Sequence, residues 1–183
     1  MDDRRVAELA ATLHAAPATA GGARLVTIDG YSGSGKTDLA GRLADAIGAP
    51  VITLEDLYPG WAGLADAVPL AVEWIAAPLA AGRPARWRRW DWVRCARGEW
   101  VSLAPAAVVL LEGCGAGAAA LRPYTSTAIW VDVPVEQRER RLRARADWPG
   151  YAPHRQQWAA QENAFYRADR TRERADLVVD NGD

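Results

Sequence analysis

Short apolar runs alternate with longer amphipathic segments along the whole chain. Runs with the length and composition of buried strands cover residues 24–29, 51–54, 106–113, 126–134 and 176–180. The segments that favour helix cover residues 4–15, 37–47, 66–80, 137–146 and 154–172. Strands separated by helices indicate a parallel sheet that is covered on both faces. We therefore predict an α/β fold with a mainly parallel five-stranded sheet between layers of helices.

Length, charge and cysteine content narrow the class of protein. The 183 residues, half of them hydrophobic, are enough for one domain with one core. A net charge of −1 gives no overall attraction to nucleic acid or to an anionic membrane. The apolar runs are too short to span a bilayer, the N-terminal segment is a poor signal peptide, and Cys95 and Cys114 fit no metal-binding or disulfide pattern. We expect a cytoplasmic protein without nucleic acid or membrane partners, and we leave a homodimer open.

The stretch GYSGSGKT, residues 30–37, lies between the first apolar run and a predicted helix. It fits G-x-x-x-x-G-K-[ST], the pattern of a phosphate-binding loop (P-loop), in the strand–loop–helix context that the pattern requires. Glycines let the backbone N–H groups wrap around phosphate oxygens, and the helix N-terminus adds positive potential. Lys36 would reach the β- and γ-phosphates, and Thr37 would offer its hydroxyl to Mg²⁺. The residues predicted to bind the nucleotide are Gly30, Ser32, Gly33, Ser34, Gly35, Lys36 and Thr37.

Lys36 is the only lysine in a chain that has 21 arginines. Arginine carries a planar fork, whereas lysine carries a compact ammonium group on a flexible stem. In a closely wrapped loop only the compact group fits between phosphates. The one position that keeps lysine therefore supports the reading of this loop as a nucleotide site.

The rest of the chain decides among P-loop proteins. It has no NKxD stretch for guanine recognition and no LSGGQ-like signature, and it is too short for an AAA+ or helicase core. Over residues 24–147 the segments DGYSGSGKT, EDLY, RRWDW and LLEG, followed by an arginine-rich segment, resemble the motifs of the uridine kinase and phosphoribulokinase-like family in order and spacing. The resemblance implies the three-layer P-loop fold with a lid. It also implies a kinase that uses ATP and Mg²⁺.

Acidic residues follow two of the predicted strands. In TLEDLY, aligning Tyr58 with the family's tyrosine puts Glu55 on the catalytic aspartate that accepts the proton of the attacking hydroxyl. Asp56 is the alternative, because neighbours in an extended segment point opposite ways, and a solvated acidic turn is a third reading. Glu112 ends the strand VVLLEG, at the edge of the sheet where ligands bind, and the resemblance implies that it supports Mg²⁺.

Residues 82–100 hold four tryptophans among six arginines. Tryptophan rings stack on planar ligands and arginines bind phosphates, and the resemblance makes this the acceptor-binding segment. Arg88 and Arg89 would bind an acidic acceptor, while Asp91 would bind sugar hydroxyls or an amine. Cys95 stands where pyrimidine kinases have a base-reading histidine, which argues against uridine or cytidine. Buried tryptophans with arginines pointing to solvent are the alternative. The predicted acceptor-binding residues are Tyr58, Arg88, Arg89, Trp90 and Asp91.

Arginines crowd the segment that follows the strand at 126–134. They stand at positions 138, 140, 141, 143, 145 and 155. Arg138, Arg141 and Arg145 share one face of a helix. Small-molecule kinases place a lid here, whose arginines neutralise the charge that develops on the transferred group. We predict a lid over about residues 138–155, with Arg141 and Arg145 as the catalytic pair and Asp147 as an ion-pair partner. A solvated helix face is the alternative.

The expected function is transfer of the γ-phosphoryl group of ATP to a hydroxyl of a small, nucleoside-like or other polar metabolite. Two alternatives remain open. One is a nucleoside monophosphate kinase, and the other is a nucleotide-binding module that senses ATP without an acceptor. The sequence also leaves open whether ATP or GTP is the donor. The predicted catalytic residues are Lys36, Glu55, Asp56, Arg141 and Arg145.

Overall fold

The computed structural model describes residues 3–18 and 22–182 of the chain. Its main sheet has five strands, in the spatial order β2-β5-β1-β6-β7, and every neighbouring pair is parallel. The strands are β1 (Arg24–Asp29), β2 (Val51–Thr53), β5 (Val108–Glu112), β6 (Thr125–Asp132) and β7 (Leu177–Asp180). All five residues of β5 are buried, as expected for a central parallel strand. The predicted α/β fold with a five-stranded parallel sheet is confirmed.

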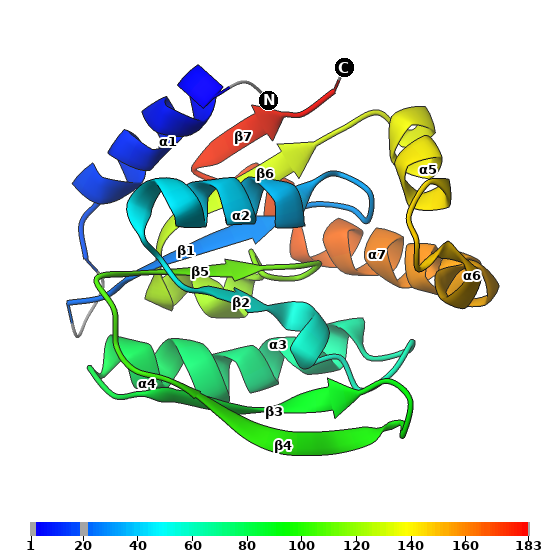
Figure 1. The fold of residues 1–183 in the computed structure, drawn as a ribbon, viewed down its shortest axis with the longest axis horizontal. Coiled ribbons are helices and arrows are strands. Elements are labelled where there is room, and N and C mark those ends of the chain that lie inside the picture. The colour runs from blue at the N-terminus through cyan, green and yellow to red at the C-terminus, as the bar shows by residue number, and fades with distance from the viewer. Residues whose placement is uncertain (1–2, 19–21, 183) are drawn as a thin grey trace.

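Helices cover both faces of this sheet, and Figure 1 shows the three layers. On one face lie α1 (Asp3–Ala15) and α2 (Lys36–Ile47), which pack on side chains such as Val26 and Leu110. On the other face lie α3 (Leu64–Ala71) and α7 (Arg155–Asp169), which pack on side chains such as Leu25 and Leu111. Successive side chains of a strand point to opposite faces of the sheet, so each strand contributes residues to two separate cores.

The predicted helix at 66–80 forms, but with a widened turn in its middle. The helix runs as α3, then the π-helical turn η2 (Val72–Ala76), then α4 (Ala77–Ala80). The N–H of Ala77 bonds to the carbonyl of Val72, five residues back. Pro78 follows directly and has no N–H to continue an α-helical ladder, so the wider turn lies where the ladder has to be interrupted.

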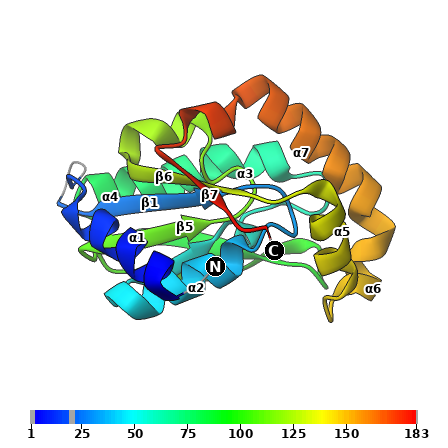
Figure 2. The same cartoon turned by 90° about the horizontal axis from the view of Figure 1, so that it is seen from above.

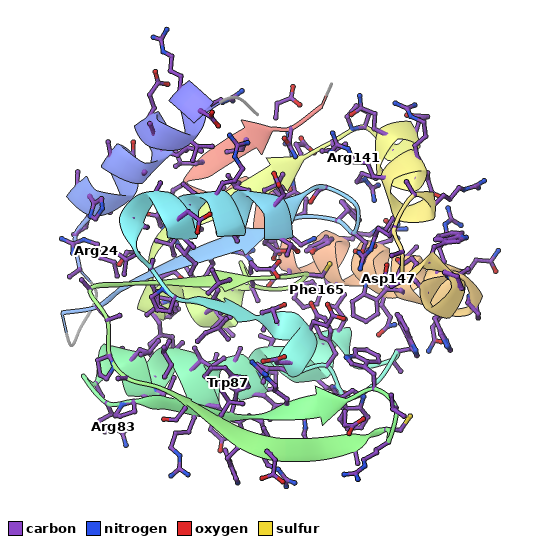
Figure 3. The ribbon with its side chains drawn as sticks, in the orientation of Figure 1. Arg24, Arg83, Trp87, Arg141, Asp147 and Phe165 are labelled. Atoms are coloured by element: carbon purple, nitrogen blue, oxygen red, sulfur yellow. The ribbon has the colours of Figure 1, made fainter. Side chains whose placement is uncertain are left out.

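A two-stranded antiparallel hairpin, which the sequence pattern did not predict, covers the outer side of the α3–η2–α4 helix. Its strands are β3 (Ala85–Asp91) and β4 (Ala96–Leu103). Trp87 points inward and is only 4% exposed (Figure 3). The pairing register shifts between Arg88 and Trp90, which breaks the two-residue alternation of polar and apolar positions. That break hides the strand from a reading based on periodicity.

The elements that follow the sheet strands gather at one end of the molecule, where Figure 2 shows α5, α6 and the start of α7. They are α5 (Val135–Arg143) and α6 (Trp148–Tyr151), with the short 3-10 turns η1 (Leu54–Asp56) and η4 (Ala152–His154). The 3-10 turns η3 (Ala119–Tyr124) and η5 (Thr171–Arg174) instead lead into the starts of β6 and β7, at the other end of the strands. The predicted break at 147–153 thus contains a turn of helix. Within the described ranges, no helix is long and apolar enough to cross a membrane.

Candidate functional site

The P-loop wraps tightly between β1 and α2, and its glycines are required by their surroundings. Gly30 has a φ of 148°, and a Cβ atom there would lie 2.5 Å from the carbonyl oxygen of Val131. Gly33 has a φ of 82°, and its Cβ would lie 2.7 Å from the carbonyl oxygen of Arg138. Any side chain at these positions would push the loop away from β6 or α5.

Asp29, the last residue of β1, anchors the start of this loop. Its carboxylate accepts hydrogen bonds from the backbone N–H groups of Gly30, Gly115 and Gly117, at 2.7, 3.1 and 2.8 Å. The hydroxyl of Tyr166 donates to it at 2.6 Å. Burial raises the pKa of Asp29, and these hydrogen bonds lower it in part. Asp29 is therefore a structural clamp, which the sequence reading missed although an acid directly before the loop was visible.

Lys36 lies folded against the loop that contains it. Its side chain is 7% exposed, and its ammonium group donates to the carbonyl oxygens of Gly30 at 2.7 Å and Tyr31 at 3.1 Å. Burial works to lower the pKa of Lys36, but the carboxylates around it, which include Glu112 and Glu162, work to raise it, and the net shift is upward. Lys36 is therefore a fixed positive charge at the loop.

One stripe of helix α7 holds the P-loop from behind. Trp158, Glu162 and Tyr166 follow each other at intervals of four residues and so share a face. The indole N–H of Trp158 donates to the hydroxyl of Ser32 at 3.0 Å, and the backbone N–H of Ser32 donates to Glu162 at 2.7 Å. The hydroxyl oxygen of Tyr166, which donates its proton to Asp29, also lies 3.1 Å from the carbonyl oxygen of Gly30. The sequence reading missed this stripe, although its spacing is visible in the helix predicted at 154–172.

Cys114 is buried behind the P-loop and faces the carboxylate of Glu162. Its thiol lies 3.1 Å from Glu162 and 3.5 Å from the carbonyl oxygen of Gly30. Burial raises the pKa of Cys114 to about 12, and nearby Lys36 lowers it only in part. The thiol is thus neutral at physiological pH and packs as a small apolar group.

Thr37 and Glu112 meet at the C-terminal edge of the sheet. The hydroxyl of Thr37 donates to the carboxylate of Glu112 at 3.4 Å, and Glu112 is only 4% exposed. Both lie beside Lys36 in the wall of one cavity. A hydroxyl and a carboxylate oxygen are the ligand types that Mg²⁺ prefers, so this pair fits the predicted metal site. Among the described residues there is no cluster of three or more acidic, histidine or cysteine side chains that would form a metal cage.

Glu55 and Asp56, the two candidates for the base, lie in different environments. Glu55 faces the cavity that holds Lys36 and Thr37. The surrounding protein raises the pKa of Glu55 by desolvation, and Arg145 lowers it in part. Asp56 lies outside the cavity wall, where its carboxylate accepts hydrogen bonds from Trp87 Nε1 at 2.8 Å and from Arg89 Nε at 2.9 Å. The geometry therefore favours Glu55 as the base, and Asp56 supports the hairpin.

Of the predicted acceptor-binding residues, one lines the cavity and four do not. Tyr58 lines the cavity, and its hydroxyl donates to the carbonyl of Cys114 at 2.9 Å. Arg88, Arg89, Trp90 and Asp91 do not line it. Arg88 donates to two carbonyls of β4, Arg89 pairs with Asp56, the ring of Trp90 stacks under Arg97, and Asp91 caps the turn between the hairpin strands. The structure thus places these four in the framework of the hairpin.

Arginines of the predicted lid segment reach the cavity from the opposite side. Arg141 and Arg145 both line it, and Figure 3 shows Arg141 on α5 and Asp147 at the connection to α6. Arg145 forms a two-point ion pair with Asp147, with N–O distances of 2.8 and 2.5 Å. The hydrogen bond from Arg145 lowers the pKa of Asp147. Arg138 instead stacks over the ring of Tyr31, at 4.5 Å.

One cavity of 460 Å³, which contains both polar and aromatic surface, brings part of the predicted site together. The predicted catalytic, metal and acceptor residues in its wall are Lys36, Thr37, Glu55, Tyr58, Glu112, Arg141 and Arg145. Of the predicted phosphate-binding residues, Gly30 and Ser34 lie in the body of the loop and not in the cavity wall. The cavity also has four aromatic residues that the sequence reading did not assign to the site. They are Trp61, Trp92, Tyr151 and Trp158.

Solved structures of kinases share this architecture. A possible uridine kinase from Bacillus stearothermophilus superimposes with a TM-score of 0.72 at 19% identity, over 98% of this chain and 100% of that chain. A proposed fructose transport system kinase from Silicibacter sp. TM1040 gives 0.67 at 19% identity, over 94% and 98% of the two chains. Shikimate kinase from Bacteroides thetaiotaomicron gives 0.51 at 18% identity, over 85% of each chain.

The chain has the fold of a P-loop kinase. No protein-family model matches its sequence, and the search of curated proteins finds no match. Identities of this size establish a shared fold. The chemistry therefore has to be argued from the cavity and its side chains.

Proposed function

We propose that this protein is a kinase that transfers the γ-phosphoryl group of ATP to a hydroxyl of a small molecule, with Mg²⁺ as its metal. One observation carries the proposal. A single cavity brings together the P-loop with Lys36, the oxygen pair Thr37–Glu112, and the carboxylate of Glu55. A site that only binds a nucleotide has no use for a carboxylate beside the γ-phosphate.

The phosphates of ATP would lie against the N–H groups of the P-loop, with Lys36 as the fixed cation. Thr37 and Glu112 would hold Mg²⁺, which neutralises phosphate charge when bound. The tight packing of Gly33 and Gly35 keeps the loop close to α5 and to Asn181, whose side-chain amide donates to the carbonyl of Ser34 at 2.9 Å. The loop is thus held in shape before the nucleotide arrives.

Glu55 would act as the general base. As the acceptor oxygen bonds to the γ-phosphorus and the bond from that phosphorus to the β–γ bridging oxygen breaks, the hydroxyl proton passes to the Glu55 carboxylate. Its raised pKa makes it a better proton acceptor than an ordinary glutamate. Arg145 and Arg141 lie on the opposite wall, where they would stabilise the negative charge of the transferred group.

The lid function of residues 138–155 rests on the same placement. Arg141 donates to the backbone carbonyl of Asn181 at 2.9 Å, while Arg145 is held by Asp147. Both arginines therefore belong to a defined arrangement at the cavity, rather than to a helix face turned only to solvent. Rearrangement of these contacts would accompany closure over the donor and acceptor.

The alternative of a nucleoside monophosphate kinase has less support. Its proposed phosphate ligands, Arg88 and Arg89, are bound to the hairpin and to Asp56, outside the cavity. The alternative of an ATP sensor gives Glu55 no role. The acceptor of the uridine kinase-like structures is not carried over, because Cys95 also lies outside the cavity wall.

A phosphoryl-transfer screen tests the proposal. Purified protein is incubated with Mg²⁺, γ-labelled ATP and a panel of alcohols, amino alcohols, sugars, nucleosides and nucleoside monophosphates. We expect label on one class of acceptor, with a loss of about 10²–10³ in rate for Lys36→Ala. Lys36→Arg keeps the charge and should lose transfer as well, while the surface variant Arg4→Ala is the matched control. ATP binding without transfer to any acceptor would instead support the sensor.

A further inference from the structure

Part of the cavity is bounded by an aromatic wall, formed by Trp61, Trp92, Tyr151 and Trp158. The ring of Trp61 lies at its centre, with its centroid 4.9 Å from Trp92, 5.7 Å from Tyr151 and 6.2 Å from Trp158. The four residues come from the segment after η1, the turn of the hairpin, α6 and α7. Four separate segments thus meet to form one aromatic surface in the cavity that Glu55 also lines.

This wall is fixed in place before any ligand binds. His154 stacks on the ring of Trp61, with a centroid distance of 4.5 Å and an interplanar angle of 11°. The side-chain amide of Gln161 donates to the backbone carbonyl of Trp61 at 2.6 Å. A wall that is already ordered loses little side-chain entropy when a ligand binds to it.

Several of the polar atoms near this wall already form hydrogen bonds within the protein. The indole N–H of Trp158 bonds to Ser32, and the hydroxyl of Tyr58 bonds to the carbonyl of Cys114. The hydroxyl of Tyr151 also interacts with Ser32. A nucleobase or a sugar would leave polar edges without partners at such a surface, and each unpaired buried group is costly. The aromatic wall therefore disfavours acceptors that must be read by hydrogen bonds.

The charges of the cavity point to a cationic acceptor. Its wall holds three carboxylates, Glu55, Glu112 and Asp147, against three cations, Lys36, Arg141 and Arg145. The wall is thus neutral overall, and bound magnesium–ATP, which carries a net negative charge, makes the site negative. The ion pair with Asp147 further reduces the effect of Arg145. An anionic acceptor would be repelled, whereas a cation would be attracted.

Arg86, Arg97 and Arg138 make cation–π contacts with rings elsewhere in the protein. The rings in these contacts belong to Trp74, Trp90, Trp100 and Tyr31. These rings all lie outside the aromatic wall. Aromatic faces next to a carboxylate are an established way to bind an ammonium group.

We infer that the phosphoryl acceptor is a small amino alcohol that is positively charged at neutral pH, with its ammonium group against the aromatic wall and its hydroxyl towards Glu55. The inference rests on the proposed kinase function and specifies its substrate class. The hydroxyl oxygen forms the new bond to phosphorus, the bond to ADP breaks, and the proton goes to Glu55. The product keeps its positive charge on the amine and gains a phosphate.

Binding of a matched pair of alcohols tests the inference on the unaltered protein. Choline and 3,3-dimethylbutan-1-ol have nearly the same shape, but only choline is charged. With Mg·ADP present, quenching of tryptophan fluorescence gives both dissociation constants, and uridine and glycerate are measured alongside. We expect choline to bind about tenfold or more tightly than its neutral counterpart. Equal binding of the pair, no binding of either, or tighter binding of uridine or glycerate would overturn the inference.

Variants of the wall show whether the preference for charge comes from these rings. Trp92→Leu and Trp61→Leu keep apolar bulk but remove the aromatic face, so the preference for choline should fall to about threefold or less. Trp100→Leu, on the same hairpin and outside the cavity, is the matched control and should keep it. A preference that persists in both wall variants would contradict the assignment to this wall.

Phosphoryl transfer separates the two proposals. Transfer to choline or another amino alcohol supports both of them. Transfer to uridine or a sugar, with no preference for cations, keeps the kinase and rejects the cationic acceptor. Selective binding of choline with no transfer to any acceptor keeps the cation site and rejects the kinase.

Discussion

Replacing Asp56 by alanine should destabilise the protein and leave phosphoryl transfer nearly unchanged, whereas Glu55→Gln should do the reverse. The two acids are neighbours in η1, yet only Glu55 faces the cavity. The carboxylate of Asp56 instead joins the hairpin to the body of the protein through Trp87 and Arg89. Separate measurements of stability and rate therefore distinguish a base from a structural acid.

The magnitude follows from the partners that Asp56 would leave behind. Trp87 is only 4% exposed. Without the carboxylate of Asp56, its buried indole N–H has no acceptor, which costs about 1–3 kcal/mol. The side chain of Arg89 is 62% exposed, so its ion pair adds no more than about 1 kcal/mol. A loss of about 2–3 kcal/mol lowers the melting temperature of a chain of this size by roughly 4–12 °C.

For Glu55→Gln the expected effects are reversed. Removal of a positioned general base lowers kcat by about 10²–10⁴. The glutamine keeps the shape of an accessible side chain, so the free energy of unfolding should stay within about 0.5 kcal/mol of the parent protein.

Thermal unfolding and ADP release, measured on the same preparations, check both variants. Asp56→Asn is a useful companion, because it keeps one oxygen as an acceptor for Trp87 and should lose less stability than Asp56→Ala. The reasoning fails if Asp56→Ala abolishes transfer at an unchanged melting temperature. It also fails if Glu55→Gln retains the parent kcat.

Three further predictions use other parts of the site. Because partial desolvation in the cavity raises the pKa of Glu55 and the base must be unprotonated, kcat/KM should fall on acidification at a higher pH than an ordinary glutamate gives. This limb should vanish in Glu55→Gln, and a limb unchanged in that variant would assign it to another group. At neutral pH iodoacetamide should modify the exposed Cys95 in the folded protein, and should reach Cys114, whose pKa is about 12, only after unfolding; mass spectrometry reports both, and rapid labelling of Cys114 in the native state would contradict its burial. Gly33→Ala places a Cβ 2.7 Å from a carbonyl oxygen of α5 at a φ of 82°, so it should weaken ATP binding and lower the free energy of unfolding by about 1–3 kcal/mol. Gly150→Ala is the control: its Cβ meets open space, so calorimetry should show almost no change in either quantity.

The sheet and the P-loop could be predicted from sequence because each leaves a local signal. The five strands are continuous apolar runs, and the loop has fixed residue types at fixed spacing. The hairpin at 85–103 could not be predicted in this way. Its alternation of buried and exposed residues is interrupted next to Arg89, where the register shifts, and its arginines resemble a ligand-binding cluster when they are read without their partners.

The residues of the candidate site also divide into those that a local sequence signal predicts and those that it does not. The order of motifs places Lys36, Thr37 and Glu112 in the cavity, because each follows a strand at the same edge of the sheet. The choice between Glu55 and Asp56 depends on which way a short 3-10 turn points, and no pattern in the sequence fixes that direction. The aromatic wall arises only in three dimensions, since Trp61, Trp92 and the pair Tyr151 and Trp158 come from stretches separated by tens of residues of chain.

Helix α7 connects the two halves of the site. Trp158 belongs both to the aromatic wall and to the stripe of α7 that holds Ser32 of the P-loop. In-line transfer requires the attacking oxygen to lie about 3–3.5 Å from the phosphorus, so independent motion of donor and acceptor sites would cost rate. Because Trp158 contacts both surfaces, α7 helps to hold them at a constant separation. Arg141 and Arg145, at the end of α5 and just after it, can then approach the transferred group while this contact is kept.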